Sequence, residues 1–166
     1  MRLNTILTIS AAMFMLTALT ACPEEPAKTN TGTGSGTSTA PSTGVQVTPG
    51  SQQDLVANYG DRIFFEFDKA DLRPDARAQV GKWAEFLKKY PQDTVTIQGH
   101  ADERGTREYN LALGERRAAS AKKYLSSLGI DSKRIATISY GKENPDPVGS
   151  NEAAWAQNRR DIMVVN

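Results

Sequence analysis

The sequence has little cysteine and histidine, with only one of each among its 166 residues. A single cysteine excludes a disulfide within the chain, and one cysteine with one histidine argues against a structural zinc site. Net charge is nearly absent as well, since 20 Lys and Arg residues oppose 19 Asp and Glu residues. This balance gives no general attraction to nucleic acid. We therefore expect no metal, no cofactor and no nucleic-acid partner.

A long apolar run is also lacking. The run at residues 6–21 has roughly 16 residues, whereas a bilayer span needs about 20. Its length, with one basic residue before it, fits a secretory signal peptide. The run ends in Leu-Thr-Ala-Cys at residues 19–22, which resembles a bacterial lipobox. We therefore expect residues 1–21 to be a signal peptide and Cys22 to be lipidated. The next residue is Pro23 and not the aspartate that retains many such lipoproteins at the inner membrane, so the resemblance favours sorting to the outer membrane.

Aromatic residues are missing from the next segment. Of its 28 residues, 23–50, 19 are Pro, Gly, Ser or Thr. Such a composition cannot bury enough apolar area to offset the entropy of ordering the chain. We interpret residues 22–53 as a lipidated cysteine followed by a disordered tether with an r.m.s. span of roughly 30 Å. Residues 54–166 have a globular composition and are predicted to form one domain.

Strand and helix patterns alternate in this last segment. Apolar and β-branched residues predict strands at residues 62–67, 94–98, 135–140 and 162–165. Helical spacing, with turn and capping signals at the ends, predicts helices at residues 74–90, 108–128 and 151–155. The order β-α-β-α-β-(α)-β indicates an α+β two-layer sandwich, with the helices packed on one mixed four-stranded sheet.

The densest group of unusual polar residues is Gly-His-Ala-Asp-Glu-Arg-Gly-Thr at residues 99–106, between the second strand and the long helix. In that helix, Asn110, Leu113 and Arg117 are spaced i, i+3, i+7 and share one face. Asp102 and Arg117 could then flank one shallow pocket, where the aspartate accepts from an ammonium and the arginine binds a carboxylate. Spacing alone also permits a simple salt-bridged surface.

These motifs resemble the OmpA-like domain family and, within it, the peptidoglycan-associated lipoproteins. The matching motifs are residues 99–106, then Glu-Tyr-Asn-Leu-Ala-Leu-Gly-Glu-Arg-Arg-Ala at 108–118, with shorter matches at 65–68, 138–143 and 157–160. The resemblance covers roughly residues 60–162. The chain departs from the family at Arg107, where proline is frequent, and in its last six residues.

The resemblance implies an OmpA-like fold that binds peptidoglycan non-covalently. The ligand it implies is meso-diaminopimelate of the stem peptide, whose far end carries both an ammonium and a carboxylate. By this resemblance Asp102 holds the ammonium and Arg117 the carboxylate. The further candidates for ligand contact are Phe67, Asp68, Leu113, Arg104 and Thr106. Arg159 and Arg160 match a late family motif in which a structural role and ligand contact are both open.

The resemblance also implies partners and a location. The partners are TolB and TolA of the Tol-Pal system, which serves envelope integrity and cell division. The location is the outer membrane, with a lipid anchor and the domain facing the periplasm, and a monomer is the simplest state. The alternative reading is a lipoprotein whose main role is binding such a protein partner rather than the wall.

A cell-wall hydrolase is the remaining alternative. His100 with Asp102 and Glu103 could be read as an acid–base or metal cluster. One histidine and no cysteine in the domain do not supply the three protein ligands of a catalytic zinc. The carboxylates of a glycosidase flank the scissile bond from opposite sides, whereas these two are adjacent in sequence. We expect no enzymatic activity, and we expect His100 to be buried or to brace the loop.

Overall fold

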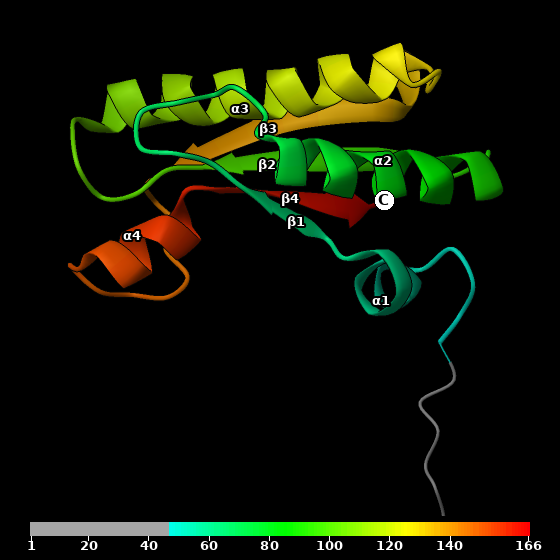
Figure 1. The fold of residues 1–166 in the computed structure, drawn as a ribbon, viewed down its shortest axis with the longest axis horizontal. Coiled ribbons are helices and arrows are strands. Elements are labelled where there is room, and N and C mark those ends of the chain that lie inside the picture. The colour runs from blue at the N-terminus through cyan, green and yellow to red at the C-terminus, as the bar shows by residue number, and fades with distance from the viewer. Residues whose placement is uncertain (1–46) are drawn as a thin grey trace, which may run out of the picture. The chain divides into compact units, whose positions relative to one another are not determined.

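The computed structural model describes residues 47–166, which contain a four-stranded sheet with two long helices on one face (Figure 1). The strands are β1 (Arg62–Phe64), β2 (Val95–His100), β3 (Ile135–Gly141) and β4 (Arg160–Val165). Their order is β1-β4-β2-β3; β2 and β3 are parallel, and β4 is antiparallel to both its neighbours. The predicted sandwich on one mixed sheet is confirmed. The expected signal peptide, Cys22 and most of the tether lie outside the described residues.

Helices α2 (Pro74–Lys89) and α3 (Arg107–Ser127) form the second layer. Helix α2 begins with a proline at its first position, where the missing N–H costs nothing. The Thr106 hydroxyl caps α3 by accepting from the N–H of Tyr109 at 3.2 Å. Both helices lie within two residues of their predicted bounds. The core between them and the sheet includes the fully buried side chains of Trp83, Phe86, Leu87, Ile97, Leu125 and Met163.

Strand β1 is shorter than the predicted strand at residues 62–67. The N–H of Phe65 still donates to the carbonyl of Arg159 at 2.8 Å, but the chain then turns away from the sheet. Asp68 has a φ of 57°, in the left-handed region that aspartate tolerates better than most residues. The turn carries Phe67 and Asp68 toward the first turns of α3, where both line a cavity.

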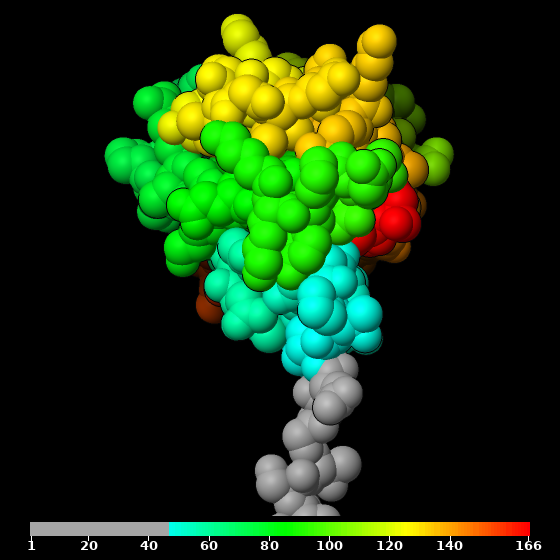
Figure 2. Space-filling model, turned by 90° about the vertical axis from the view of Figure 1, so that its right-hand side faces the viewer, coloured from blue at the N-terminus to red at the C-terminus, as the bar shows by residue number. Residues whose placement is uncertain are grey.

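A helical segment that the sequence did not predict precedes β1. Helix α1 (Gln52–Asp54) continues into a π-helical turn, η1 (Leu55–Tyr59). The side-chain amide of Gln52 donates to the carbonyl of Met163 at 3.2 Å and accepts from the N–H of Val165 at 2.8 Å. Figure 2 shows this segment, in cyan, directly against α2. The expected start of the domain falls inside this segment.

Helix α4 (Glu152–Asn158) lies beyond the loop that follows β3, at the opposite end of the sheet from α1 (Figure 1). The predicted cap is confirmed, because the Asn151 side chain accepts from the N–H of Ala154 at 2.9 Å. A 3₁₀ turn, η2 (Ser132–Arg134), joins α3 to β3. No helix among residues 47–166 is long and apolar enough to cross a membrane.

Helix α3 approaches β2 very closely at one point. A Cβ added to Gly99 would lie 2.0 Å from the carbonyl oxygen of Gly114. Only two residues without side chains allow the helix backbone and the strand backbone to come so near. This contact fixes the start of α3 against the end of β2, and so it positions the loop at residues 101–106 between them.

Candidate functional site

A cavity of about 190 Å³ opens between the turn after β1, the loop after β2 and the first turns of α3. Its lining residues are Phe67, Asp68, Asp102, Arg104, Gly105, Tyr109, Asn110, Leu113 and Arg117. The structure thus brings together six of the seven residues predicted to contact ligand. The seventh, Thr106, does not line the cavity and caps α3 instead.

Arg117 lies in the wall of this cavity, yet its side chain is fully buried. Its Nε donates to the backbone carbonyl of Lys69 at 2.8 Å. Its Nη1 donates to the carbonyl of His100 at 2.8 Å, and its Nη2 donates to the carbonyl of Glu66 at 3.1 Å. Each terminal nitrogen keeps one further N–H. Burial lowers the pKa of Arg117 to about 10, against the opposing charge of Asp161. The guanidinium is therefore a cation at neutral pH.

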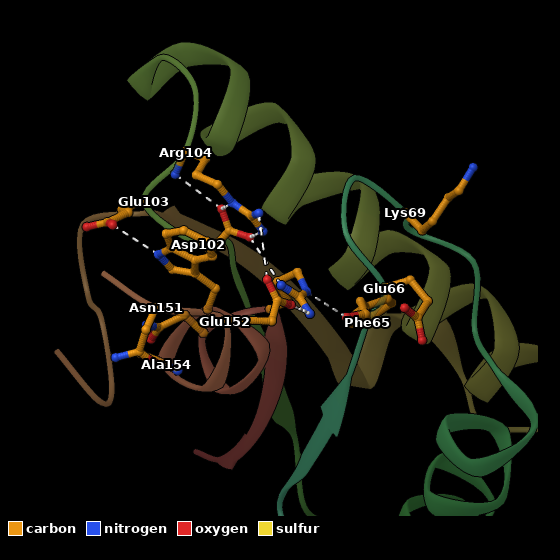
Figure 3. A network of polar contacts seen from close by, with 12 residues as sticks. Phe65, Glu66, Lys69, Asp102, Glu103, Arg104, Asn151, Glu152 and Ala154 are labelled. Carbon is orange, nitrogen blue, oxygen red and sulfur yellow. Dashed lines mark hydrogen bonds and ion pairs between the residues drawn. The ribbon is translucent and has the colours of Figure 1, made fainter. Parts of the chain in front are cut away.

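Asp102 is the anion of the cavity. Burial raises the pKa of its carboxyl, but the hydrogen bonds and charge of Arg104, together with Arg159, outweigh burial and leave the pKa below its usual value. Oδ1 accepts from the backbone N–H of Arg104 at 3.1 Å and from its Nε at 3.0 Å. Oδ2 accepts from Arg104 Nη2 at 2.6 Å and from Arg159 Nη1 at 3.5 Å (Figure 3). Asp102 is therefore ionised and already well paired.

The charges around the cavity balance. Its lining contains two guanidinium groups, of Arg104 and Arg117, and two carboxylates, of Asp68 and Asp102. A ligand with one positive and one negative group adds no net charge to such a site. A ligand with a single charge leaves an excess of one sign in a partly buried place, which is costly. The arrangement therefore favours a zwitterion.

Comparison with known proteins shows the family of the chain. Residues 64–160 match the model of the OmpA family. The chain is 46% identical over 164 residues to the peptidoglycan-associated lipoprotein of Brucella melitensis, which covers 95% of this chain and 91% of that protein. The chain belongs to the peptidoglycan-associated lipoproteins of the OmpA family.

Solved structures agree on the fold. The crystal structure of the peptidoglycan-associated lipoprotein from Burkholderia pseudomallei matches with a TM-score of 0.62 and 42% identity, over 64% of this chain and 90% of that one. The C-terminal domain of Helicobacter pylori MotB matches with a TM-score of 0.60 at 20% identity, over 64% of this chain and 84% of that one. The latter likeness shows the fold alone.

Two further side chains of the site were not among the predicted ligand contacts. Tyr109 and Asn110 line the cavity; the Asn110 side chain donates to the carbonyls of Arg104 at 2.8 Å and Thr106 at 3.1 Å and so braces the loop. The i, i+3, i+7 spacing with Arg117 was the available signal for Asn110. No pattern in the sequence pointed to Tyr109.

The two late arginines brace the structure. Arg159 is buried, and its Nε donates to the carbonyl of Phe65 at 3.1 Å. Arg160 is also buried and donates to the side chain of Asn158 at 3.1 Å. Neither lines the cavity, so their structural role is the one that the contacts support. Arg107, at the departure from the family, pairs with Glu143 at 3.2 Å and also lies outside the cavity.

His100 is buried, as expected, with its ring stacked on Tyr140 at a centroid distance of 5.4 Å. Burial, aided by the charge of Arg160, lowers the pKa of His100 to about 4. The imidazole is therefore neutral at physiological pH and adds no charge behind the loop. No group of three or more His, Cys, Asp or Glu side chains placed to hold a metal occurs within residues 47–166.

Asp161 on β4 gives a prediction about pH. Its carboxyl is fully buried, and neither oxygen has a hydrogen-bond partner in the described part of the chain. Burial raises the pKa of Asp161 well above the usual value, and the negative charge of Glu115 raises it further. The positive charge of Arg117 lowers this pKa but does not offset burial. The native state therefore keeps a proton that the unfolded chain loses above about pH 4. Stability falls as pH rises from there, by up to about 1.4 kcal/mol per pH unit, until the native pKa is reached.

We expect Asp161→Asn to remove this loss. Urea unfolding from pH 4 to 8 should show the variant gaining on the native protein as pH rises, by at least about 1 kcal/mol at neutral pH. Asp71→Asn, at an exposed position, is the matched control and should follow the native curve. Parallel curves for Asp161→Asn and the native protein would contradict the raised pKa of Asp161.

Proposed function

We propose that this protein is an outer-membrane lipoprotein that binds peptidoglycan non-covalently through meso-diaminopimelate of the stem peptide. Its role would be to hold the outer membrane to the cell wall as part of the Tol-Pal system, which serves envelope integrity and cell division. The observation that carries the proposal is one cavity lined by an aspartate anion and an arginine cation in a chain of the peptidoglycan-associated lipoproteins.

The two ends of the diaminopimelate side chain fit the two sides of this cavity. The unused N–H groups of Arg117 would donate to the carboxylate, and Asp102 would accept from the ammonium. Leu113, which is buried in the cavity wall, would contact the methylene groups between them, and Phe67, which is 55% exposed, would cover them. Asp68 would complete the wall and accepts a hydrogen bond from the Tyr109 hydroxyl.

Anchoring and reach would come from the N-terminal part of the chain. Residues 1–21 would be removed as a signal peptide, Cys22 would carry the lipid, and the tether, which ends where α1 begins at Gln52, would let the domain face the periplasm. Stable anchoring needs more than one acyl chain. Lipoprotein processing at Cys22 would attach these chains. Many reversible contacts of this kind in parallel can hold two layers together without covalent attachment. No enzymatic step is part of this proposal.

The test is co-sedimentation with purified sacculi. The full chain should pellet with diaminopimelate-type wall and stay in the supernatant with lysine-type wall, whose stem residue lacks the second carboxylate. Asp102→Asn should weaken binding by about 2–4 kcal/mol, or roughly 30- to 1000-fold, because it leaves the ligand ammonium without its counter-charge. Glu108→Gln, at an exposed acidic residue beside Tyr109, is the control and should bind as the native protein does.

A folded native protein that stays in the supernatant with both walls would refute the wall-binding proposal. Binding to TolB and TolA would then become the leading function. If TolB competes with the wall, Asp102→Asn should weaken both interactions; a TolB complex that forms normally with this variant would argue against shared residues.

A further inference from the structure

The Asp102 carboxylate has no acceptor site left for a ligand in this structure. A carboxylate accepts about four hydrogen bonds. Arg104 makes three of these contacts, through its backbone N–H, its Nε and its Nη2, and Arg159 makes the fourth (Figure 3). The side chain of Asp102 is only 5% exposed. An ammonium group that is to reach Asp102 must first replace one of these partners.

Arg104 is the partner that can leave. Its side chain is 32% exposed, whereas that of Arg159 is 8% exposed and donates to the carbonyl of Phe65 as well. Its guanidinium lies between two aromatic rings, 4.1 Å from the centroid of Phe67 and 4.2 Å from that of Trp155. A cation is attracted to an aromatic face within about 6 Å of the ring centroid, so the guanidinium can shift by about 1–2 Å along the rings and keep both contacts.

Trp155 is itself held in place. Its Nε1 donates to the Glu103 carboxylate at 2.9 Å, so helix α4 is pinned to the loop that carries Arg104 (Figure 3). A second acceptor lies along the same slot, because Oε2 of Glu152 is 3.8 Å from Arg104 Nη1. Glu152 also accepts from Arg159 at 2.9 Å, which holds it near this position.

We propose that Arg104 is an internal stand-in for the ammonium group of the ligand, which must be displaced from Asp102, and that Glu152 receives it. In the free protein Arg104 neutralises Asp102. When the ligand binds, the guanidinium moves between Phe67 and Trp155 toward Glu152, and the ligand ammonium takes its place. Asp102 is thus paired with a cation both before and after the movement, and Arg104 is paired with a carboxylate in both positions. This proposal rests on the proposed function and adds a positioning role for Glu152.

The consequence for affinity follows from competition. A ligand that binds only when Arg104 has left Asp102 has its apparent affinity reduced by the fraction of protein in that open state. Without the arginine side chain, the protein is always in the open state and its apparent affinity rises. Without the charge of Glu152, the open state is less populated and the apparent affinity falls further. Arg104 thus sets how tightly the site holds any ligand whose ammonium goes to Asp102, so that each contact with the wall is weak and reversible.

The experiment is calorimetric titration of the purified full chain with a soluble meso-diaminopimelate stem tripeptide. Arg104→Gln should bind about three- to tenfold more tightly than the native protein. Glu152→Gln should bind about threefold more weakly. In the double variant the effect of Glu152→Gln should vanish, so that it binds like Arg104→Gln alone. Arg107→Gln, which removes an exposed arginine paired with Glu143 outside the cavity, is the matched control.

The outcomes separate this proposal from the proposed function. Loss of a purely structural contact or of a direct ligand contact weakens binding, so a gain with Arg104→Gln is the diagnostic result. Equal or weaker binding by Arg104→Gln, with Asp102→Asn still weakening binding as expected, would refute the stand-in and leave the function standing. An effect of Glu152→Gln that persists without Arg104 would refute the role of Glu152. Absence of binding by the folded native protein would refute both.

Discussion

Gly99→Ala should leave little folded protein. The added Cβ would lie 2.0 Å from the carbonyl oxygen of Gly114, a separation that real Cβ atoms do not show. The atom it meets belongs to the helix backbone, so no side-chain rotation can relieve the clash. Helix α3 would have to move away from β2, which separates the two layers at the end of the sheet that carries the loop at residues 101–106. We expect a loss of more than about 4 kcal/mol, a large part of the stability of a domain of this size.

The measurement is thermal unfolding of the purified protein by circular dichroism. Gly81→Ala provides the control, because this glycine lies in α2 with nothing within 4 Å of an added Cβ. Alanine is the better helix former by roughly 1 kcal/mol, so this variant should be at least as stable as the native protein. A cooperative transition near the native temperature for Gly99→Ala would show that the two backbones do not approach as described.

Arg117→Met should also be strongly destabilising, even though Arg117 belongs to the binding site. Its guanidinium joins the carbonyls of Lys69, His100 and Glu66, and it lies 4.9 Å from the ring of Phe65. Methionine fills much of the space but removes a donor from three carbonyls, of which that of Glu66 still accepts from the N–H of Lys69. We expect a loss of about 3–5 kcal/mol, from the measured cost of breaking buried charge contacts.

Arg116→Met is the control for this variant. Arg116 is the preceding residue and is exposed, so its replacement should change stability by no more than about 0.5 kcal/mol. Urea unfolding of both variants gives the comparison. A change of less than 1 kcal/mol for Arg117→Met would contradict the structural role. If the expected loss occurs, reduced wall binding by Arg117 variants needs a stability correction, and Asp102→Asn is the cleaner probe of ligand contact.

The fold was largely predictable because its signals are local. Proline at the start of α2, the asparagine cap of α4 and Gly129 after α3 mark element ends within a few residues of sequence. The first strand was overestimated, since its apolar alternation continues through Phe67 while its partner strand begins only at Arg160. The segment at residues 52–59 was missed because it is short and is stabilised through Gln52 by the distant strand β4.

The candidate site was predictable to a smaller extent. Asp102 lies on one loop and Arg117 on one face of the helix that follows it. Both the loop and the helical face can be recognised in the sequence, so their meeting at one cavity was predictable. The stack of Phe67, Arg104 and Trp155 joins three distant segments, and no spacing in the sequence indicates it. The carbonyl partners of Arg117 could not be predicted either, because every residue has a backbone carbonyl and the sequence does not show which ones a side chain reaches.

The position of the α1 segment determines how the domain responds to force. The chain enters through Gln52, whose amide pairs with the C-terminal end of β4 as a neighbouring strand would. The cavity is lined by the loop after β2 and the first turns of α3. This loop and the start of α3 lie at the other end of the sheet from α1 (Figure 1). A pull between the entering chain and a ligand in the cavity therefore runs along β2 and β4, nearly perpendicular to the hydrogen bonds that join them. Bonds loaded in this direction share the force and must break together, so the sheet resists shear rather than opening one bond at a time.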